Sequence, residues 1–234
     1  MNKNFGKLKE KKLHSEIKKY ISGDTTLHEK EVEGFLIDVV KDQTLFEVQT
    51  GNFSNIKNKL DVLLKNHKVR LVYNIPALKI IKNLDAKGDV VSVRKSPKKG
   101  KICDAAKELI YIADIVTRDN FSFEIIFTKE EEVRIDDQKG SWRRKGLSVK
   151  ERNLLEVIDN KLFLAKNDYI ELLPEKFRNP EITFSSSDIK NELKRTASLS
   201  RKIIYFLKKI NLIEKADKNG NLIIYRIVSS PVKV

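Results

Sequence analysis

The sequence of 234 residues contains a single cysteine, Cys103, and only three histidines, at positions 14, 28 and 67. A lone cysteine excludes an intramolecular disulfide framework and any metal site with two cysteine ligands. The histidines have no HxxxH or comparable ligand spacing, which argues against a zinc site built from them. Cys103 is therefore best interpreted as a small buried side chain.

Long apolar runs and glycine-rich loops are missing as well. No stretch approaches the roughly 18 apolar residues of a membrane-spanning helix, so no membrane contact is expected. The basic N-terminal segment lacks the apolar core of a signal peptide, which favours a cytoplasmic protein. No phosphate-binding glycine-rich loop is present, so the sequence does not imply dependence on ATP or GTP.

Positive charge is what the sequence has in excess. There are 47 Lys and Arg residues against 33 Asp and Glu residues, a formal net charge of +14, and the pI is near 9.6. The basic residues gather in segments 1–20, 139–150 and 188–218. Clustered positive charge favours a contact surface for a polyanion, above all nucleic acid, over general solubility.

Residues 35–53, FLIDVVKDQTLFEVQTGNF, place polar side chains within two apolar runs. Residues 35–40 and 44–49 are rich in Val, Ile, Leu and Phe, which is typical of β-strands. The polar residues between them predict a hairpin whose turn lies near Asp42 and Gln43.

The register of this hairpin would oppose two carboxylates. With a two-residue turn, Val40 faces Leu45 and Asp38 faces Glu47, with Cβ atoms about 4.5–5.5 Å apart. Two unpaired charges on an apolar face would repel each other and would be costly to bury. A divalent cation such as Mg²⁺ or Mn²⁺ would compensate them. The alternative is an exposed Asp38 that pairs with one of the many lysines.

Asp38 followed by Glu47-Val48-Gln49 resembles the PD-(D/E)xK nuclease superfamily, in which an Asp and a Glu-x-Lys across a hairpin hold the catalytic metal. The run from Glu47 to Phe53 also resembles a group of uncharacterised prokaryotic proteins with a restriction-endonuclease-like front end. The resemblance covers about residues 5–75, which include a first helix with a glutamate, the hairpin, a helix near 54–65 and a strand at 69–75.

This resemblance implies that Asp38 and Glu47 ligate Mg²⁺ or Mn²⁺ and that the carbonyl of Val48 can add a ligand. It also implies a helix glutamate, Glu16, near the metal, although Glu16 could equally pair with a surface lysine. Glu33, on a strand expected at 27–34, is a further candidate for a metal or water contact.

The chain departs from the superfamily at Gln49, which stands where a lysine is expected. Glutamine can orient an attacking water but carries no charge and cannot act as a base near neutral pH. Some relatives supply the lysine from the following helix. Lys57 shares a helical stripe with Phe53 and Leu60, so it is the candidate for a displaced lysine; a solvated Lys57 is the alternative.

The middle of the chain predicts an α+β region with basic loops. Ser148 and Glu151 form a capping box, which predicts a helix at 149–159. Trp142 precedes Arg143, Arg144 and Lys145, a combination that can stack bases and bind phosphates or pack between domains. Other elements are expected as a basic loop at 95–101, a helix at 103–116 and strands at 121–128 and 132–135.

Residues 182–228 resemble a winged helix-turn-helix domain. Ser187 predicts the start of one helix, a second is expected at 199–210, and Asn219-Gly220 predicts the turn of a hairpin. A protein-interaction or dimerisation module is the alternative interpretation. The resemblance implies nucleic-acid contacts by Ser198, Ser200, Arg201 and Lys202 on the second helix and by Lys218 and Asn219 in the wing.

Together these features predict an α/β protein with three parts. They are a restriction-endonuclease-like mixed-sheet core at 1–80, an α+β middle region at 81–180 and a winged helix-turn-helix domain at 181–234. The expected function is that of a Mg²⁺- or Mn²⁺-dependent endonuclease acting on nucleic acid, DNA in particular, and a homodimer would suit cleavage of both strands. The alternative is a catalytically inactive DNA-binding or regulatory protein on a nuclease fold.

Overall fold

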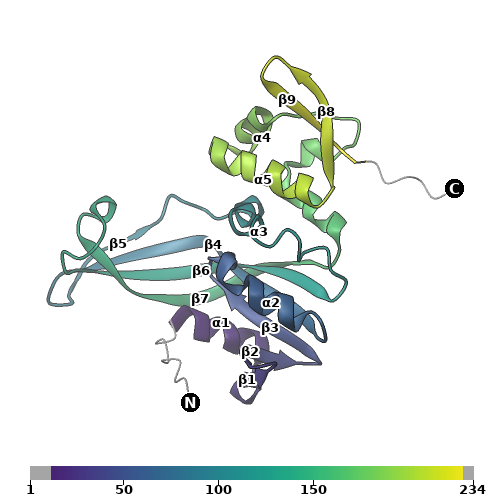
Figure 1. The fold of residues 1–234 in the computed structure, drawn as a ribbon. Coiled ribbons are helices and arrows are strands. Elements are labelled where there is room, and N and C mark those ends of the chain that lie inside the picture. Colours follow the sequence, from purple (N-terminus) through teal and green to yellow (C-terminus); the bar gives the residue numbers. More distant parts are fainter. Residues whose placement is uncertain (1–11, 229–234) are drawn as a thin grey trace.

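The computed structural model describes residues 12–228, whose arrangement is shown in Figure 1. A seven-stranded mixed sheet forms the body of the protein, and a two-stranded sheet lies in the C-terminal region. The predicted mixture of helices with a mixed sheet is therefore confirmed. Among the described residues, no helix is long and apolar enough to cross a membrane. Residues 1–11, which include the start of the predicted nuclease-like core and part of the basic segment 1–20, lie outside the described residues.

The main sheet has the order β1-β2-β3-β4-β6-β7, and β5 pairs with the second half of β4. Strands β1 to β3 form an antiparallel meander, β3, β4 and β6 are parallel, and β7 returns antiparallel to β6. The strands are β1 (His28–Val32), β2 (Phe35–Lys41), β3 (Thr44–Gln49), β4 (Lys68–Leu84), β5 (Val90–Lys95), β6 (Phe121–Asp136) and β7 (Leu147–Phe163).

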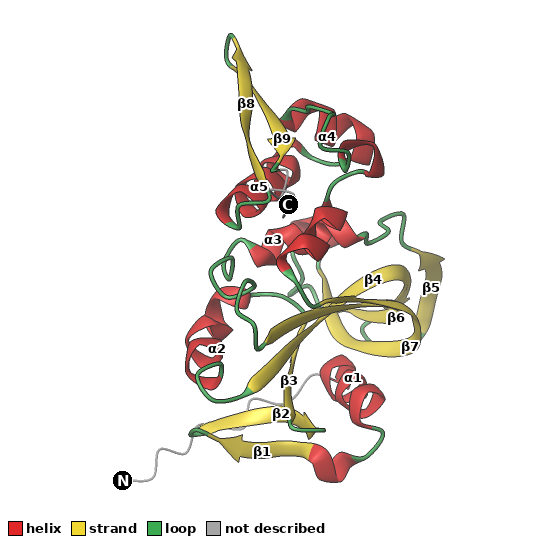
Figure 2. Ribbon diagram, turned by 90° about the vertical axis from the view of Figure 1, so that its right-hand side faces the viewer, coloured by secondary structure: helices red, strands yellow, loops and turns green. Residues whose placement is uncertain are grey.

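Helices cover both faces of the first half of this sheet. Figure 2 shows α1 (Lys12–Ser22) and α2 (Lys57–Leu63) on opposite sides of β3. The apolar stripe of α1 packs with Val48 of β3 in one cluster. The stripe of α2 belongs to a larger cluster that contains Leu45. We call these two sides of the sheet the α1 face and the α2 face.

The β2–β3 hairpin has the predicted register next to its turn, but the ladder ends before the predicted pair of Asp38 with Glu47. Asp42 and Gln43 both have positive φ, 48° and 58°, as a two-residue type I′ turn requires. Val40 pairs with Leu45, as the sequence predicted. The order of α1, three strands, α2 and a fourth strand parallel to the third also follows the sequence expectation.

The prediction of a helix at 149–159 is wrong, because this segment lies within β7 and pairs with β6. The hydroxyl of Ser148 donates to Asp137 rather than capping a helix. A capping interaction contributes only about 1 kcal/mol, so long-range pairing with a neighbouring strand overrides it. The helix expected at 103–116 is also shorter, a 3₁₀ turn at Ile102–Ala105 followed by α3 (Ala106–Leu109).

The predicted boundary between residues 80 and 81 falls inside β4. This strand pairs with β6 as far as Leu84 and with β5 from Ile80 onwards, so one sheet continues through both predicted units. The strands expected at 121–128 and 132–135 are likewise one strand, β6.

The C-terminal region has the predicted order of two helices and a hairpin. Its first helix is capped by Ser185 rather than Ser187, since the Ser185 hydroxyl accepts from the backbone N–H of Asp188. The region packs through Phe206 on the 3₁₀ segment that follows β7, where the ring centroid of Tyr169 lies 5.3 Å from that of Phe206. Its elements are α4 (Ser186–Leu193), α5 (Ala197–Lys209), β8 (Ile213–Asn219) and β9 (Leu222–Ile227).

Candidate functional site

Followed from the turn, the hydrogen-bonded pairing of β2 with β3 ends at the pair Val39–Phe46 and does not include Asp38. Beyond that point the Asp38 side chain takes over the role of a ladder partner. Its Oδ2 accepts a hydrogen bond of 2.8 Å from the backbone N–H of Val48. The side chain of β2 therefore lies against the backbone of β3 where the strand pairing stops.

Two groups of α1 converge on the same carboxylate. His14 Nε2 lies 3.3 Å from Asp38 Oδ2, and Lys18 Nζ lies 3.9 Å from Asp38 Oδ1. Burial alone would raise the pKa of Asp38, but the hydrogen bond and charge of His14, the N–H of Val48 and the charge of Lys18 lower it below its ordinary value. Asp38 is consequently ionised at neutral pH.

His14 also lies 2.9 Å, through Nε2, from the carbonyl oxygen of Val48. An imidazole nitrogen, a carboxylate oxygen and a backbone carbonyl oxygen thus meet at one point on the α1 face. Sequence reasoning missed His14 because an isolated histidine has no ligand spacing. The available signal was its position four residues before Lys18 and three before Ile17, on the buried stripe of the first helix.

Glu47 is the second carboxylate of the predicted pair and is 2% exposed. Lys59 Nζ lies 2.5 Å from its Oε1 and 2.5 Å from the carbonyl oxygen of Leu36. Burial and then the charge of Asp38 raise the pKa of Glu47 to about 7, against the lowering effect of Lys59. Glu47 can therefore gain or lose a proton near neutral pH.

The two carboxylates are adjacent but are held by different layers. Asp38 is bound by α1, whereas Glu47 is bound by a lysine of α2. The backbone N–H of Asp38 donates to the Glu47 carboxylate, and the negative charge of Asp38 raises the pKa of Glu47. The predicted neighbours are thus electrostatically linked without sharing one face of the sheet.

The lysine that reaches the pair is not the one predicted. Lys57 points to Asp114, with a distance of 2.8 Å between Nζ and Oδ1, while Lys59 reaches Glu47. Residues two positions apart on a helix point in directions that differ by about 200° around its axis, so Lys57 and Lys59 lie on nearly opposite sides of α2. The prediction chose Lys57 because it assumed that the helix begins earlier than it does. Gln49 ends β3 beside Tyr73 and, among the described residues, has no side-chain hydrogen bond.

The two additional glutamates lie elsewhere. Glu16 Oε2 accepts a hydrogen bond of 2.6 Å from the backbone N–H of Leu154 and so binds β7. Glu33 accepts from Asn66 at 3.1 Å and lies 3.4 Å from His67, in the connection after α2. Neither glutamate contacts Asp38 or Glu47, which corrects the expectation for both.

The resemblance implies a divalent cation held by Asp38 and Glu47. In residues 12–228, no group of three or more His, Cys, Asp and Glu side chains is placed to hold a metal ion. The meeting point of His14, Asp38 and the Val48 carbonyl offers two oxygen ligands to Mn²⁺ or Mg²⁺. His14 Nε2 donates a hydrogen bond to the Val48 carbonyl, so it would become a ligand only in the other tautomer of the ring. Glu47 would join this set only after exchanging Lys59 for the cation.

The predicted basic contacts of the C-terminal region are only partly accessible. Ser200 is fully buried and donates to the carbonyl of Thr196, so it is not available to nucleic acid. Ser198 and Arg201 are exposed, and Lys202 is half-buried. Lys218 and Asn219 lie exposed at the end of β8, next to the hairpin turn.

A groove of about 600 Å³ lies between α5 and β9. Arg201, Tyr205 and Lys208 line it at helical spacing together with Lys209. Of these residues only Arg201 was predicted from the sequence, although spacings of four, seven and eight residues from it mark the others.

The Trp142 to Lys145 segment connects β6 to β7. Trp142 is 83% exposed, and the Arg143 guanidinium lies 5.6 Å from its ring centroid. Arg144 donates to the carbonyl of Leu147, which fixes the loop. An exposed indole that carries a stacked guanidinium leaves both open to a partner, and this segment remains a predicted nucleic-acid contact.

Comparisons with known proteins place the sheet unit in a family. The sequence model of a domain of unknown function, DUF8091, matches residues 11–163, a range that ends with the last residue of β7. An uncharacterised protein of Treponema pallidum (strain Nichols) is 31% identical over 215 residues, which are 92% of this chain and 84% of that protein. No solved structure matches the chain. The protein therefore belongs to the DUF8091 family.

Proposed function

We propose that the protein is a metal-dependent nuclease that hydrolyses phosphodiester bonds, with DNA as its expected substrate. The observation that carries this proposal is the position of His14 Nε2. It lies 3.3 Å from Asp38 Oδ2 and 2.9 Å from the carbonyl oxygen of Val48. The hydrogen bonds of His14 hold these groups together on the α1 face. A cation that took the place of the His14 hydrogen would find one nitrogen and two oxygens beside a titratable glutamate.

The chain order supports the same proposal. One helix, three antiparallel strands, a second helix and a fourth strand parallel to the third is the order that the PD-(D/E)xK resemblance implies. The carboxylates occupy the hairpin in the centre of this unit. The basic groove between α5 and β9 and the exposed Trp142 segment would add affinity for a polyanion.

Each residue has a role that its own chemistry permits. Asp38, His14 and the Val48 carbonyl would hold the cation, which when bound lowers the pKa of water and neutralises charge on the phosphate. Glu47, with a pKa of about 7, can accept a proton near neutral pH. Lys59 supplies the positive charge that Gln49 cannot, and Gln49 can orient a water by hydrogen bonding.

Cleavage assays on supercoiled, linear, single-stranded and branched DNA and on RNA, in Mg²⁺ or Mn²⁺, test the proposal. Asp38→Asn and His14→Ala should each reduce cleavage by about 100-fold or more. Lys59→Gln should reduce it strongly, whereas Lys57→Gln is a matched control on the same helix and should leave it within about twofold. Cleavage that survives Asp38→Asn and His14→Ala would contradict the assignment of the site.

The second candidate is a DNA-binding or regulatory protein without turnover. The ion pair between Lys59 and Glu47, together with Gln49 in place of lysine, favours it, because both keep the second carboxylate away from a cation. Binding to DNA that weakens steeply with salt, with no cleavage of any substrate in either metal, would select this candidate.

A further inference from the structure

A second polar cluster lies farther along the α1 face, in a cavity of about 300 Å³. Val72 and Ile126 pack on α1, and Asn74 and Thr128 follow them two residues later on β4 and β6. Asn74 and Thr128 contact each other and Glu130 through hydrogen bonds of 2.5–2.9 Å. The cavity therefore continues the face that carries His14 and Asp38.

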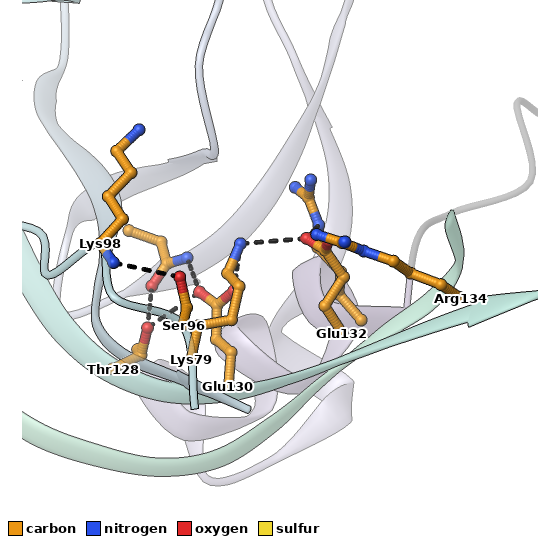
Figure 3. A network of polar contacts seen from close by, with 9 residues as sticks. Lys79, Ser96, Lys98, Thr128, Glu130, Glu132 and Arg134 are labelled. Carbon is orange, nitrogen blue, oxygen red and sulfur yellow. Dashed lines mark hydrogen bonds and ion pairs between the residues drawn. The ribbon is translucent and has the colours of Figure 1, made fainter. Parts of the chain in front are cut away.

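One carboxylate in this cluster binds an unusual number of cations. Glu132 lies 3.1 Å from Lys79, 2.7 Å from Arg134 and 3.1 Å from Arg152, as Figure 3 shows for the two labelled partners. These contacts lower the pKa of Glu132 to about 2 in spite of its burial. Lys79 also lies 3.9 Å from Glu130. The lining of the whole cavity holds positive charge in excess, with five cations against three carboxylates: Lys79, Lys98, Lys107, Arg134 and Arg152 against Asp104, Glu130 and Glu132.

Part of that excess has no internal partner. Within residues 12–228, Arg152 uses only Nε on Glu132, which leaves both terminal nitrogens without a hydrogen bond. The Lys98 Nζ also has none, and Figure 3 shows its side chain extending from the loop beside the cluster. Guanidinium forks and ammonium groups that remain free in a recess are ready donors to a phosphate.

The loop that carries Lys98 is held close to β4. Its Ser96 N–H donates to the carbonyl of Lys79 at 2.7 Å, and the Gly100 N–H donates to that of Pro76 at 2.9 Å. A Cβ at position 100 would lie 2.3 Å from Ile75 Cγ2 and 2.7 Å from the Pro76 carbonyl, so this approach requires glycine. The wall of the cavity is thus fixed by backbone contacts.

The cavity adjoins the candidate cation site. Its lining includes Leu13 and Thr50, which are the chain neighbours of His14 and Gln49. A nucleic-acid strand with one phosphate at His14 and Asp38 could therefore place another phosphate in the cavity without leaving the α1 face.

We propose that this cavity binds a phosphate group of the nucleic-acid strand, next to the position at which the strand is cut. The proposal rests on the proposed nuclease function for the identity of the ligand. Arg152 and Lys98 would donate to the phosphate oxygens, and Glu132 would hold Arg134 and Lys79 in place beneath it. The phosphate could be a terminal monoester or an internal diester, both of which present the same oxygens.

The test is equilibrium binding of fluorescent single-stranded oligonucleotides in EDTA, so that no cleavage is needed. The double variant Lys98→Gln with Arg152→Gln should bind about tenfold more weakly than the unaltered protein. Lys87→Gln with Arg94→Gln, two exposed positions outside the cavity, removes the same charge and should change affinity less than about threefold. Inorganic phosphate should compete with the oligonucleotide in the unaltered protein but much less in the cavity variant.

Oligonucleotides with a 5′-phosphate, a 3′-phosphate or hydroxyl ends distinguish the two sources of the phosphate. A preference for one phosphorylated end that disappears in the cavity variant assigns a terminal phosphate, and equal loss for all three assigns an internal one. Lys98→Gln alone alters an exposed side chain and should show the same direction of effect if the double variant loses stability. Equal weakening in cavity and control variants would overturn the proposal, whereas absence of cleavage with intact cavity binding would count against the nuclease function alone.

Discussion

Glu47 in the β2–β3 hairpin and Glu132 in the cavity formed by β4, β6 and β7 are buried almost equally, but their pKa values are shifted in opposite directions. Glu47 is 2% exposed and Glu132 is 3% exposed. The pKa of Glu47 is raised to about 7, whereas that of Glu132 is lowered to about 2. Glu47 faces one lysine and a neighbouring negative charge, while Glu132 faces three cations.

At equal burial, the number and sign of the neighbouring charges therefore decide the pKa of a buried carboxylate, and with it whether the group titrates near neutral pH. A carboxylate that stays ionised at every relevant pH is a fixed anchor for cations. One that titrates near neutrality can exchange a proton or a partner. The hairpin therefore has the properties of a reactive site and the cavity those of a rigid binding site.

Removal of the Glu132 carboxylate should have the largest effect on the free energy of unfolding. Glu132→Gln leaves Lys79, Arg134 and Arg152 without their shared carboxylate, and we expect a loss of about 3 kcal/mol in the free energy of unfolding. Urea denaturation monitored by circular dichroism measures it. Glu156→Gln, at an exposed ion pair on β7, is the control and should cost less than about 0.5 kcal/mol. A loss for Glu132→Gln no larger than that of the control would break the comparison.

Removal of the single lysine should have a smaller effect that depends on pH. Lys59→Met leaves Glu47 buried without its cation, so the pKa of Glu47 should rise further. At pH 8 we expect a loss of about 2 kcal/mol, since the unpaired charge must be neutralised. At pH 5, where Glu47 is already protonated, the loss should be smaller. Denaturant titrations at both pH values test this, and an identical loss at the two would show that Lys59 acts through packing alone.

An effect of similar size concerns the pH dependence of the unaltered protein. The folded state retains a proton on Glu47 up to about pH 7, whereas the unfolded chain releases it near pH 4.5. The folded state thus binds more protons in this window, so this group lowers the free energy of unfolding as pH rises through it. Glu47→Gln should remove that decline, which amounts to about 2 kcal/mol between pH 5 and pH 8. NMR titration of the Glu47 carboxyl carbon gives the pKa directly, and a value near 4.5 would refute the contrast.

The hairpin was predictable because its determinants are local. Two apolar runs and a two-residue polar turn fix the pairs next to the turn, such as Val40 with Leu45. The predicted pairing of Asp38 with Glu47 is not part of this ladder, although the two carboxylates lie close enough to interact. The C-terminal helices and hairpin were predictable for the same reason, since caps and an Asn-Gly turn mark their ends.

Contacts between distant segments could not be predicted in this way. His14 reaches the hairpin from 24 residues away in the chain and carries no motif, and Lys59 rather than Lys57 faces Glu47 only because α2 begins where it does. The capping box at Ser148 gave the wrong element because the pairing of β7 with β6 has no counterpart in the local sequence. The cations that bind Glu132 come from three strands, so no single stretch reveals them.

Strand β4 runs from the candidate cation site to the cavity around Glu132, so it sets the distance between them. Val72 lies beside Val48 in the parallel pairing, and Lys79 of the same strand borders the cavity. Seven residues of β-strand span at most about 23 Å. At about 3.4 Å per nucleotide step this is an upper limit of roughly seven steps of a stacked strand. Oligonucleotides of that length or longer could therefore reach both regions at once, and the near end of the cavity, at Tyr73 and Asn74, is within reach of shorter ones.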